Sequence, residues 1–240
     1  MLAGLLTAGV AQAADMPLKA PPRAAPYYTD WTGFYLFGFG GYSWGKISGD
    51  DVDLGRLFLG NGHNPKPKGG VFGFGGGYNW QYGAWVGGVE VDYGFSDEKD
   101  NQTRTGCLEI VRVEAVAQCA SANLHSKIDA LGSARLRAGY LFTPNLLAYG
   151  TAGVGWGRSE LSFSECVGNR CETLLDAKPN LFGWVAGGGL EYKLFEHVRI
   201  RGEYLHYDFG STSYAFQPII TLNAKTRDDV ARGALIWSFN

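Results

Sequence analysis

The sequence lacks several features that identify large classes of protein. None of its apolar runs approaches the roughly 18 residues that a membrane-spanning helix needs, although alternating strands would escape that test. Charged residues make up only 18% of the 240 residues, and the net charge of −2 does not favour nucleic acid as a partner. No glycine-rich segment carries the Gly-Lys-Ser/Thr of a phosphate-binding loop, and the four histidines are scattered. The sequence therefore offers no transmembrane helix and no nucleotide-binding motif.

Glycine and aromatic residues are abundant instead, with 36 glycines and 14% Phe, Trp and Tyr. The clearest pattern is residues 85–95, WVGGVEVDYGF. On a β-strand, Trp85, Val89 and Val91 share one apolar face, and Glu90 and Asp92 share the other. Eleven residues also suffice for a tilted strand to cross the hydrocarbon layer. A soluble sheet would bury the apolar face and a membrane barrel would turn it towards lipid, so one strand leaves both open.

The same alternation recurs along the chain. It predicts eight strands, at or within residues 31–45, 70–80, 85–95, 125–142, 146–157, 181–194, 198–209 and 229–239. Long polar connections follow alternate strands (46–68, 96–123, 158–179 and 210–227), and short turns join the others. A soluble eight-stranded barrel would not place charge at the middle of its inward face on most strands. The sequence therefore predicts an all-β, eight-stranded antiparallel up-and-down transmembrane barrel with long extracellular loops and short periplasmic turns.

The N-terminus is typical of an exported protein. Residues 2–10 are apolar and residues 11–13, AQA, match a cleavage site, so residues 1–13 are expected to be a signal peptide. No basic residue precedes Lys19, which indicates a truncated n-region. Residues 14–30 are proline-rich and predict a semi-extended periplasmic linker. The barrel is expected to occupy residues 31–240.

The chain has four cysteines, and an even number in an exported protein favours disulfides. The sequence alone allows three connectivities. The pairs Cys107–Cys119 and Cys166–Cys171 are favoured because each lies within one polar connection. A metal site is the alternative, but the Cys-x4-Cys spacing has no matching partner, and no metal is expected.

Five segments, in order, resemble the small outer-membrane barrels of alphaproteobacteria: WTGFYLFGFGGYSWG, GGVEVDYGF, ARLRAGYLF, GWVAGGGLEYKL and RIRGEYLHYDFG. These barrels are often called outer membrane immunogenic proteins and belong to the OmpA-like transmembrane barrel superfamily. The resemblance implies a cell outer membrane location, with lipid, lipopolysaccharide and the barrel-assembly machinery as partners, and no cofactor. Such chains usually end on an aromatic assembly signal, which here is Phe239, followed by Asn240.

Strand parity predicts a set of charged side chains inside the barrel. The set holds four acids and four arginines, so its formal charges cancel: Glu90, Asp92, Arg135, Arg137, Glu191, Arg201, Glu203 and Arg232. Charges in a narrow interior are tolerated only when paired, and the planar fork of arginine can bridge two carboxylates. We expect these residues to form a connected network that plugs the lumen.

Several functions remain open at this point. A structural barrel that displays four loops is favoured, and a narrow porin for small solutes or ions is the main alternative. A surface adhesin or haem-binding protein is a further one, with His63 and His125 near the barrel mouth, and its ligand is unknown. Catalysis by Glu90 and Asp92 is disfavoured because no Ser-His-Asp constellation accompanies them, so the protein is not expected to be an enzyme.

Overall fold

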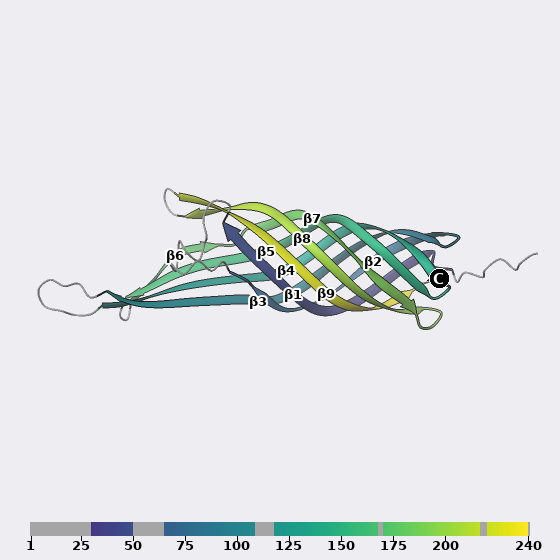
Figure 1. Cartoon of the computed structure of the whole chain (residues 1–240), viewed down its shortest axis with the longest axis horizontal. Coiled ribbons are helices and arrows are strands. Elements are labelled where there is room, and N and C mark those ends of the chain that lie inside the picture. The colour runs from purple at the N-terminus through teal and green to yellow at the C-terminus, as the bar shows by residue number, and fades with distance from the viewer. Residues whose placement is uncertain (1–29, 50–64, 109–117, 168–169, 217–219, 240) are drawn as a thin grey trace, which may run out of the picture.

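The computed structural model describes residues 30–49, 65–108, 118–167, 170–216 and 220–239. The predicted signal peptide and most of the linker lie outside these residues. Within them the chain forms antiparallel strands that run along one long axis (Figure 1). Across this part of the chain, no helix is long and apolar enough to span a membrane. The predicted all-β, antiparallel up-and-down architecture is therefore confirmed.

The described residues contain nine strands, of which eight pair into a closed ring. Around the ring the order is β1-β2-β3-β4-β5-β7-β8-β9, and β9 pairs back to β1. The strands are β1 Gly33–Gly49, β2 Lys68–Tyr82, β3 Trp85–Leu108, β4 Gln118–Thr143, β5 Leu146–Val167, β6 Arg170–Ala177, β7 Asn180–Lys193, β8 Val198–Phe216 and β9 Ile220–Ser238. Closure leaves no exposed sheet edge in the ring.

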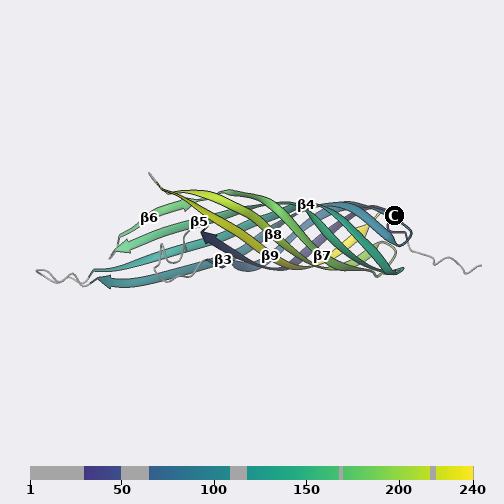
Figure 2. The same ribbon diagram turned by 45° about the horizontal axis from the view of Figure 1, so that its top comes forward.

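All four predicted long loops are wrong in part, because the strands continue into them. The overlap is small for 46–68, where β1 runs on to Gly49 and β2 begins at Lys68. Strands β3 and β4 stay paired through most of 96–123, and β8 and β9 through most of 210–227. The segment 158–179 contains the end of β5 and all of β6. Strand β6 pairs with β5 alone and is, among the described strands, the one outside the ring. Figures 1 and 2 show these extensions projecting from one end of the barrel. The strands stay paired there although the outward face is no longer apolar, and alternate residues such as Glu98, Leu161 and Thr226 remain buried on the inward face. We call this the loop end, and the opposite end, with its short connections, the turn end.

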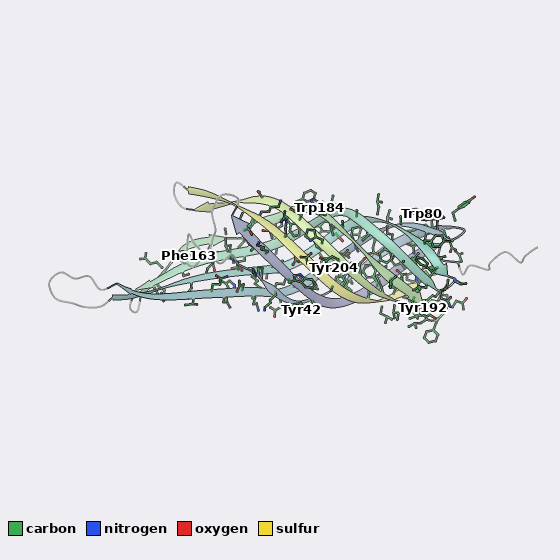
Figure 3. All side chains as sticks on the ribbon, in the orientation of Figure 1. Tyr42, Trp80, Phe163, Trp184, Tyr192 and Tyr204 are labelled. Atoms are coloured by element: carbon green, nitrogen blue, oxygen red, sulfur yellow. A yellow bond between two sulfur atoms is a disulfide. The ribbon has the colours of Figure 1, made fainter. Side chains whose placement is uncertain are left out.

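The outer surface of the ring is apolar and bounded by aromatic residues at both ends. Exposed aromatics nearer the loop end form one girdle: Tyr42, Trp44, Phe95, Trp184 and Tyr204. Those at the turn end form another: Trp80, Tyr82, Trp85, Tyr140, Phe142, Tyr192, Trp237 and Phe239. Figure 3 shows Tyr42, Trp184 and Tyr204 across the middle of the molecule, with Trp80 and Tyr192 near the turn end. An apolar band between aromatic girdles is the surface that a membrane barrel presents to lipid.

Strand β1, whose two faces are both apolar, turns three of its aromatic side chains inward: Tyr35, Phe37 and Phe39. These rings fit because each lies directly opposite a glycine of β2, as Tyr35 with Gly77, Phe37 with Gly75 and Phe39 with Gly73. A Cβ at Gly75 would come within 2.4 Å of the Phe37 ring, so alanine has no room there. The glycines of β2 therefore provide space for aromatic side chains inside a narrow barrel.

Candidate functional site: a charged network across the barrel lumen

The structure brings all eight of the charged residues named above into the lumen. They come from β3, β4, β7, β8 and β9, and none is more than 6% exposed. Each lies on the inward face because side chains alternate along a strand, so that Arg135 and Arg137, for example, share one side of β4. The barrel thus concentrates its charges at mid-depth, in a region shielded from bulk water.

Arg135 is the centre of one half of this network. Its Nη2 contacts a carboxylate oxygen of Glu90 and lies 2.8 Å from Oδ2 of Asp92, both on β3. Its Nη1 donates to Oε1 of Glu203 on β8 at 3.0 Å. Arg232 on β9 joins the same two strands, since its Nη2 lies 2.8 Å from Asp92 and 2.7 Å from Glu203. Two arginines therefore tie three carboxylates together.

The other half is centred on Glu191 of β7. Its Oε2 accepts hydrogen bonds from Arg137 at 2.8 Å and from Arg201 at 3.1 Å. Arg201 also places Nη1 2.8 Å from Oε2 of Glu90. This last contact spans the lumen, because β3 and β8 stand four strands apart in both directions around the ring. The two halves are thus one connected network that joins opposite walls.

Three members of the network were missed in the sequence. Arg199 is buried beside Glu191, and its Nη1 lies 2.9 Å from Oε1 without the alignment of a hydrogen bond. With Arg199 the network has nine charged groups, five arginines and four acids, and a formal charge of +1. Tyr35 donates to Glu90 at 2.8 Å, and Tyr149 donates to Glu203 at 2.7 Å. Arg199 has the parity of Arg201 and was detectable. The tyrosines were not, because aromatics that alternate on these strands are typical of the lipid face.

Apolar and aromatic side chains cover the network on both sides. Arg232 lies over the Phe39 ring at 4.2 Å and Arg201 over Phe37 at 4.8 Å, both at cation–π distance. Towards the turn end, Trp31 is 1% exposed and donates Nε1–H to the carbonyl of Pro144 at 3.2 Å. Its ring packs in a cluster with Val86, Leu141, Leu147 and Tyr149. The lumen is therefore filled by charged and apolar layers in succession.

A separate pair of buried acids lies towards the loop end. Glu98 of β3 accepts a hydrogen bond from Ser96 at 2.6 Å, and Asp228 of β9 accepts one from Ser43 at 2.7 Å. The two carboxyls also interact with each other, and Oε2 of Glu98 has no other donor among the described residues. Burial raises the pKa of Glu98 from 4.5 to about 7, against the lowering effect of the serine hydroxyl. A proton shared by the two carboxyls would satisfy both.

The remaining predicted residues lie near the ends of the barrel. Cys166 and Cys171 form a disulfide between β5 and β6. Cys107 and Cys119 lie directly opposite each other in the β3–β4 register, and the pairing of their side chains stays a prediction. The exposed ring of Phe239 lies at the turn end. His63 is outside the described residues, whereas Nδ1 of His125 contacts Asn101. No group of three His, Cys, Asp or Glu side chains suited to a metal ion occurs in the described part of the chain.

The sequence also matches known proteins. The family model of the outer membrane protein β-barrel domain matches residues 1–232. The chain belongs to this outer-membrane β-barrel family. The outer-membrane location is thereby confirmed, and relatives from Brucella and Rhizobium confirm the resemblance to small alphaproteobacterial barrels. The band between the two girdles is the part of this outer-membrane barrel that spans the bilayer.

Two relatives show how far the similarity of this outer-membrane barrel extends. The 31 kDa outer-membrane immunogenic protein of Brucella melitensis biotype 1 is 30% identical over 95% of this chain and 93% of its own length. The 22 kDa outer membrane protein of Rhizobium leguminosarum bv. viciae is 31% identical over 82% of this chain and 71% of its own. Among solved structures, Neisserial surface protein A is 13% identical, with a TM-score of 0.46 over 87% of this chain and 98% of that chain.

Proposed function

We propose that this protein is a structural, non-enzymatic barrel of the outer membrane, with a closed lumen and with the loop end facing the cell exterior. It would anchor in the envelope and present its strand extensions at the cell surface. The signal peptide and linker expected before residue 31 fit this route of export.

The contact between Arg201 and Glu90 is the observation that carries the proposal. These side chains come from opposite walls, and their 2.8 Å separation leaves no room for water between them. The aromatic layer at Phe37 and the Trp31 cluster obstruct the same axis above and below. An eight-stranded ring encloses an interior that side chains can just fill. Solute passage would require several of these layers to move together.

Conductance tests the proposal. The refolded wild type in a planar bilayer is expected to give no steady current. The variant Glu90→Ala/Arg135→Ala/Arg201→Ala is the comparison, because it removes side chains from the centre of the network and should open the lumen. It is expected to conduct, provided that it keeps the heat-dependent gel shift of a folded barrel. Large, steady wild-type conductance would reject the closed lumen and favour the narrow porin. Such a pore would prefer anions because the nine network groups carry one surplus positive charge.

A further inference from the structure

Basic side chains gather on the outer surface of the barrel, just beyond the loop-end girdle. Lys46 of β1 and Arg227 of β9 lie directly opposite each other in the register, and both are exposed. On the other side of β1, the hydrogen bonds Gly45 N–H to Pro67 O and Ile47 N–H to Pro65 O place residue 66, an exposed lysine, opposite Lys46. Like charges that face each other across strands destabilise a sheet unless an anion compensates them.

Few acids compensate this patch. We define the basic patch as Lys46, Lys66, Lys68, Lys225 and Arg227. Asp208 forms ion pairs with the last two of these residues. Its Oδ2 lies 3.6 Å from Nζ of Lys225 and 2.9 Å from Nε of Arg227. Among the residues that the structure describes, the Nζ atoms of Lys46, Lys66 and Lys68 have no carboxylate within ion-pair distance. Asp100 lies near this side of the patch, where it accepts a hydrogen bond from the backbone N–H of Lys66 at 2.7 Å.

The lysines on the neighbouring strands are different. Lys99 of β3 contacts Asp97, and Lys127 of β4 contacts Asp129. Lys178, between β6 and β7, lies 3.0 Å from Glu160. Each of these three lysines has its own carboxylate. Among the described residues beyond the loop-end girdle, the exposed basic side chains without an ion pair are the three lysines Lys46, Lys66 and Lys68, which lie together beside β1 and β2, and the single Arg158 on β5.

The surface below the patch suits an acyl chain. Tyr42 and Trp44 of β1 stack at 6.4 Å, and Tyr204 of β8 lies 6.3 Å from Trp44 (Figure 3). Deeper in the apolar band, three glycines lie directly opposite one another on β1, β9 and β8: Gly40, Gly233 and Gly202. A Cβ at Gly40 or at Gly202 would meet nothing within 4 Å, so the packing of the barrel does not itself require glycine there.

We propose that the basic patch binds the phosphate groups of one lipopolysaccharide molecule of the outer leaflet, with its acyl chains lying over the three glycines. The inference rests on the proposed orientation, in which the loop end faces the exterior. Phosphate suits the patch because it is a multivalent anion with several acceptor oxygens, and lysine is a common phosphate ligand. The patch lies at the depth where a membrane-anchored phosphate would sit, immediately outside the aromatic girdle.

Native mass spectrometry of the refolded full chain with lipid A tests this proposal. The wild type is expected to retain one bis-phosphorylated lipid A at least about tenfold more tightly than the same lipid after phosphatase treatment. Lys46→Gln/Lys66→Gln/Lys68→Gln should abolish that preference. The control variant Lys127→Gln/Arg158→Gln/Lys178→Gln removes the same number of charges from β4, β5 and the connection between β6 and β7, on the other side of the barrel, and should keep it.

Three results would overturn the proposal. They are equal retention of phosphorylated and dephosphorylated lipid, equal losses in the two triple variants, and a dimer that occupies the face and persists without lipid. Both variants must keep the heat-dependent gel shift, which excludes misfolding as the cause. Conductance of the same preparations reports on the closed lumen alone, so failure of the lipid site and failure of the proposed closure are distinguishable.

Discussion

Replacing Glu90 by glutamine is the most direct test of how the network stabilises the barrel. The change keeps the size of the side chain and removes its charge. Glu90 contacts Arg135, lies 2.8 Å from Arg201 and 3.5 Å from Arg137, and accepts a hydrogen bond from Tyr35. Its loss raises the formal charge of the nine groups from +1 to +2 inside the barrel.

The expected cost follows from the burial of these groups. Breaking a buried ion pair by removing one partner typically costs about 3–5 kcal/mol, because the remaining charge is left uncompensated. The amide oxygen of glutamine can still accept one hydrogen bond, so we expect the lower end, about 3 kcal/mol. Urea unfolding in phosphatidylcholine vesicles, followed by tryptophan fluorescence, measures this loss as a lower midpoint.

Two further variants make the measurement specific. Asp97→Asn removes an exposed acid that pairs with Lys99, and it should leave the midpoint unchanged. Glu90→Gln/Arg201→Gln removes one charge of each sign and should recover part of the loss, which a double-mutant cycle quantifies. If Glu90→Gln were as stable as Asp97→Asn, the network would contribute no stability and the reasoning would be refuted.

Three other predictions concern the ends of the barrel. Burial raises the pKa of Glu98 from 4.5 to about 7, so the contribution of this group to stability is full below pH 4.5 and is lost as pH rises through 7, by about 3 kcal/mol at most; Glu98→Gln should remove this part of the pH dependence in urea midpoints measured between pH 4 and pH 8. Replacing Cys166 and Cys171 by serine should cost at most about 2 kcal/mol and should keep the heat-dependent gel shift, because the disulfide closes a short loop outside the ring; loss of the shift would contradict its peripheral role. Phe239→Ala should reduce the outer-membrane fraction of the protein in cells without changing refolding in detergent, and equal membrane levels would show that this ring is no assembly signal.

The strands of the membrane band are well predicted from the sequence because apolar and charged residues alternate there. On β3, Val89 and Val91 face lipid and Glu90 and Asp92 face the lumen, so the alternation alone predicts which side chains lie on each face. The same rule fails on β1, where the lumen also accepts aromatics such as Tyr35. The glycines of β2 leave space for these inward aromatic rings. The sequence does not show which glycine lies opposite which ring, because that depends on the register between the two strands.

Beyond the band the alternation carries less information, because the outward face meets water and the buried face also holds polar residues such as Ser96, Glu98 and Thr226. The paired extensions of β3 and β4 therefore look like loops in the sequence, although their backbones are regularly bonded. The acid pair of Glu98 and Asp228 was missed for a related reason. The two residues are distant in sequence. Glu98 lies in the predicted loop 96–123 and Asp228 just before the predicted strand 229–239, and only the closed ring brings their strands to facing positions.

The match between the glycines of β2 and the aromatics of β1 has a consequence for how such barrels change over time. Each glycine–aromatic row across the lumen holds a nearly constant total volume, because the circumference is fixed by the number of strands and their stagger. A larger residue at Gly75 would meet the Phe37 ring and also the backbone carbonyl oxygen of Val91, 2.6 Å from the added Cβ, so a smaller side chain in place of Phe37 does not by itself make room. These glycines should therefore rarely be replaced, whereas the lipid-facing positions beside them are free to change one at a time.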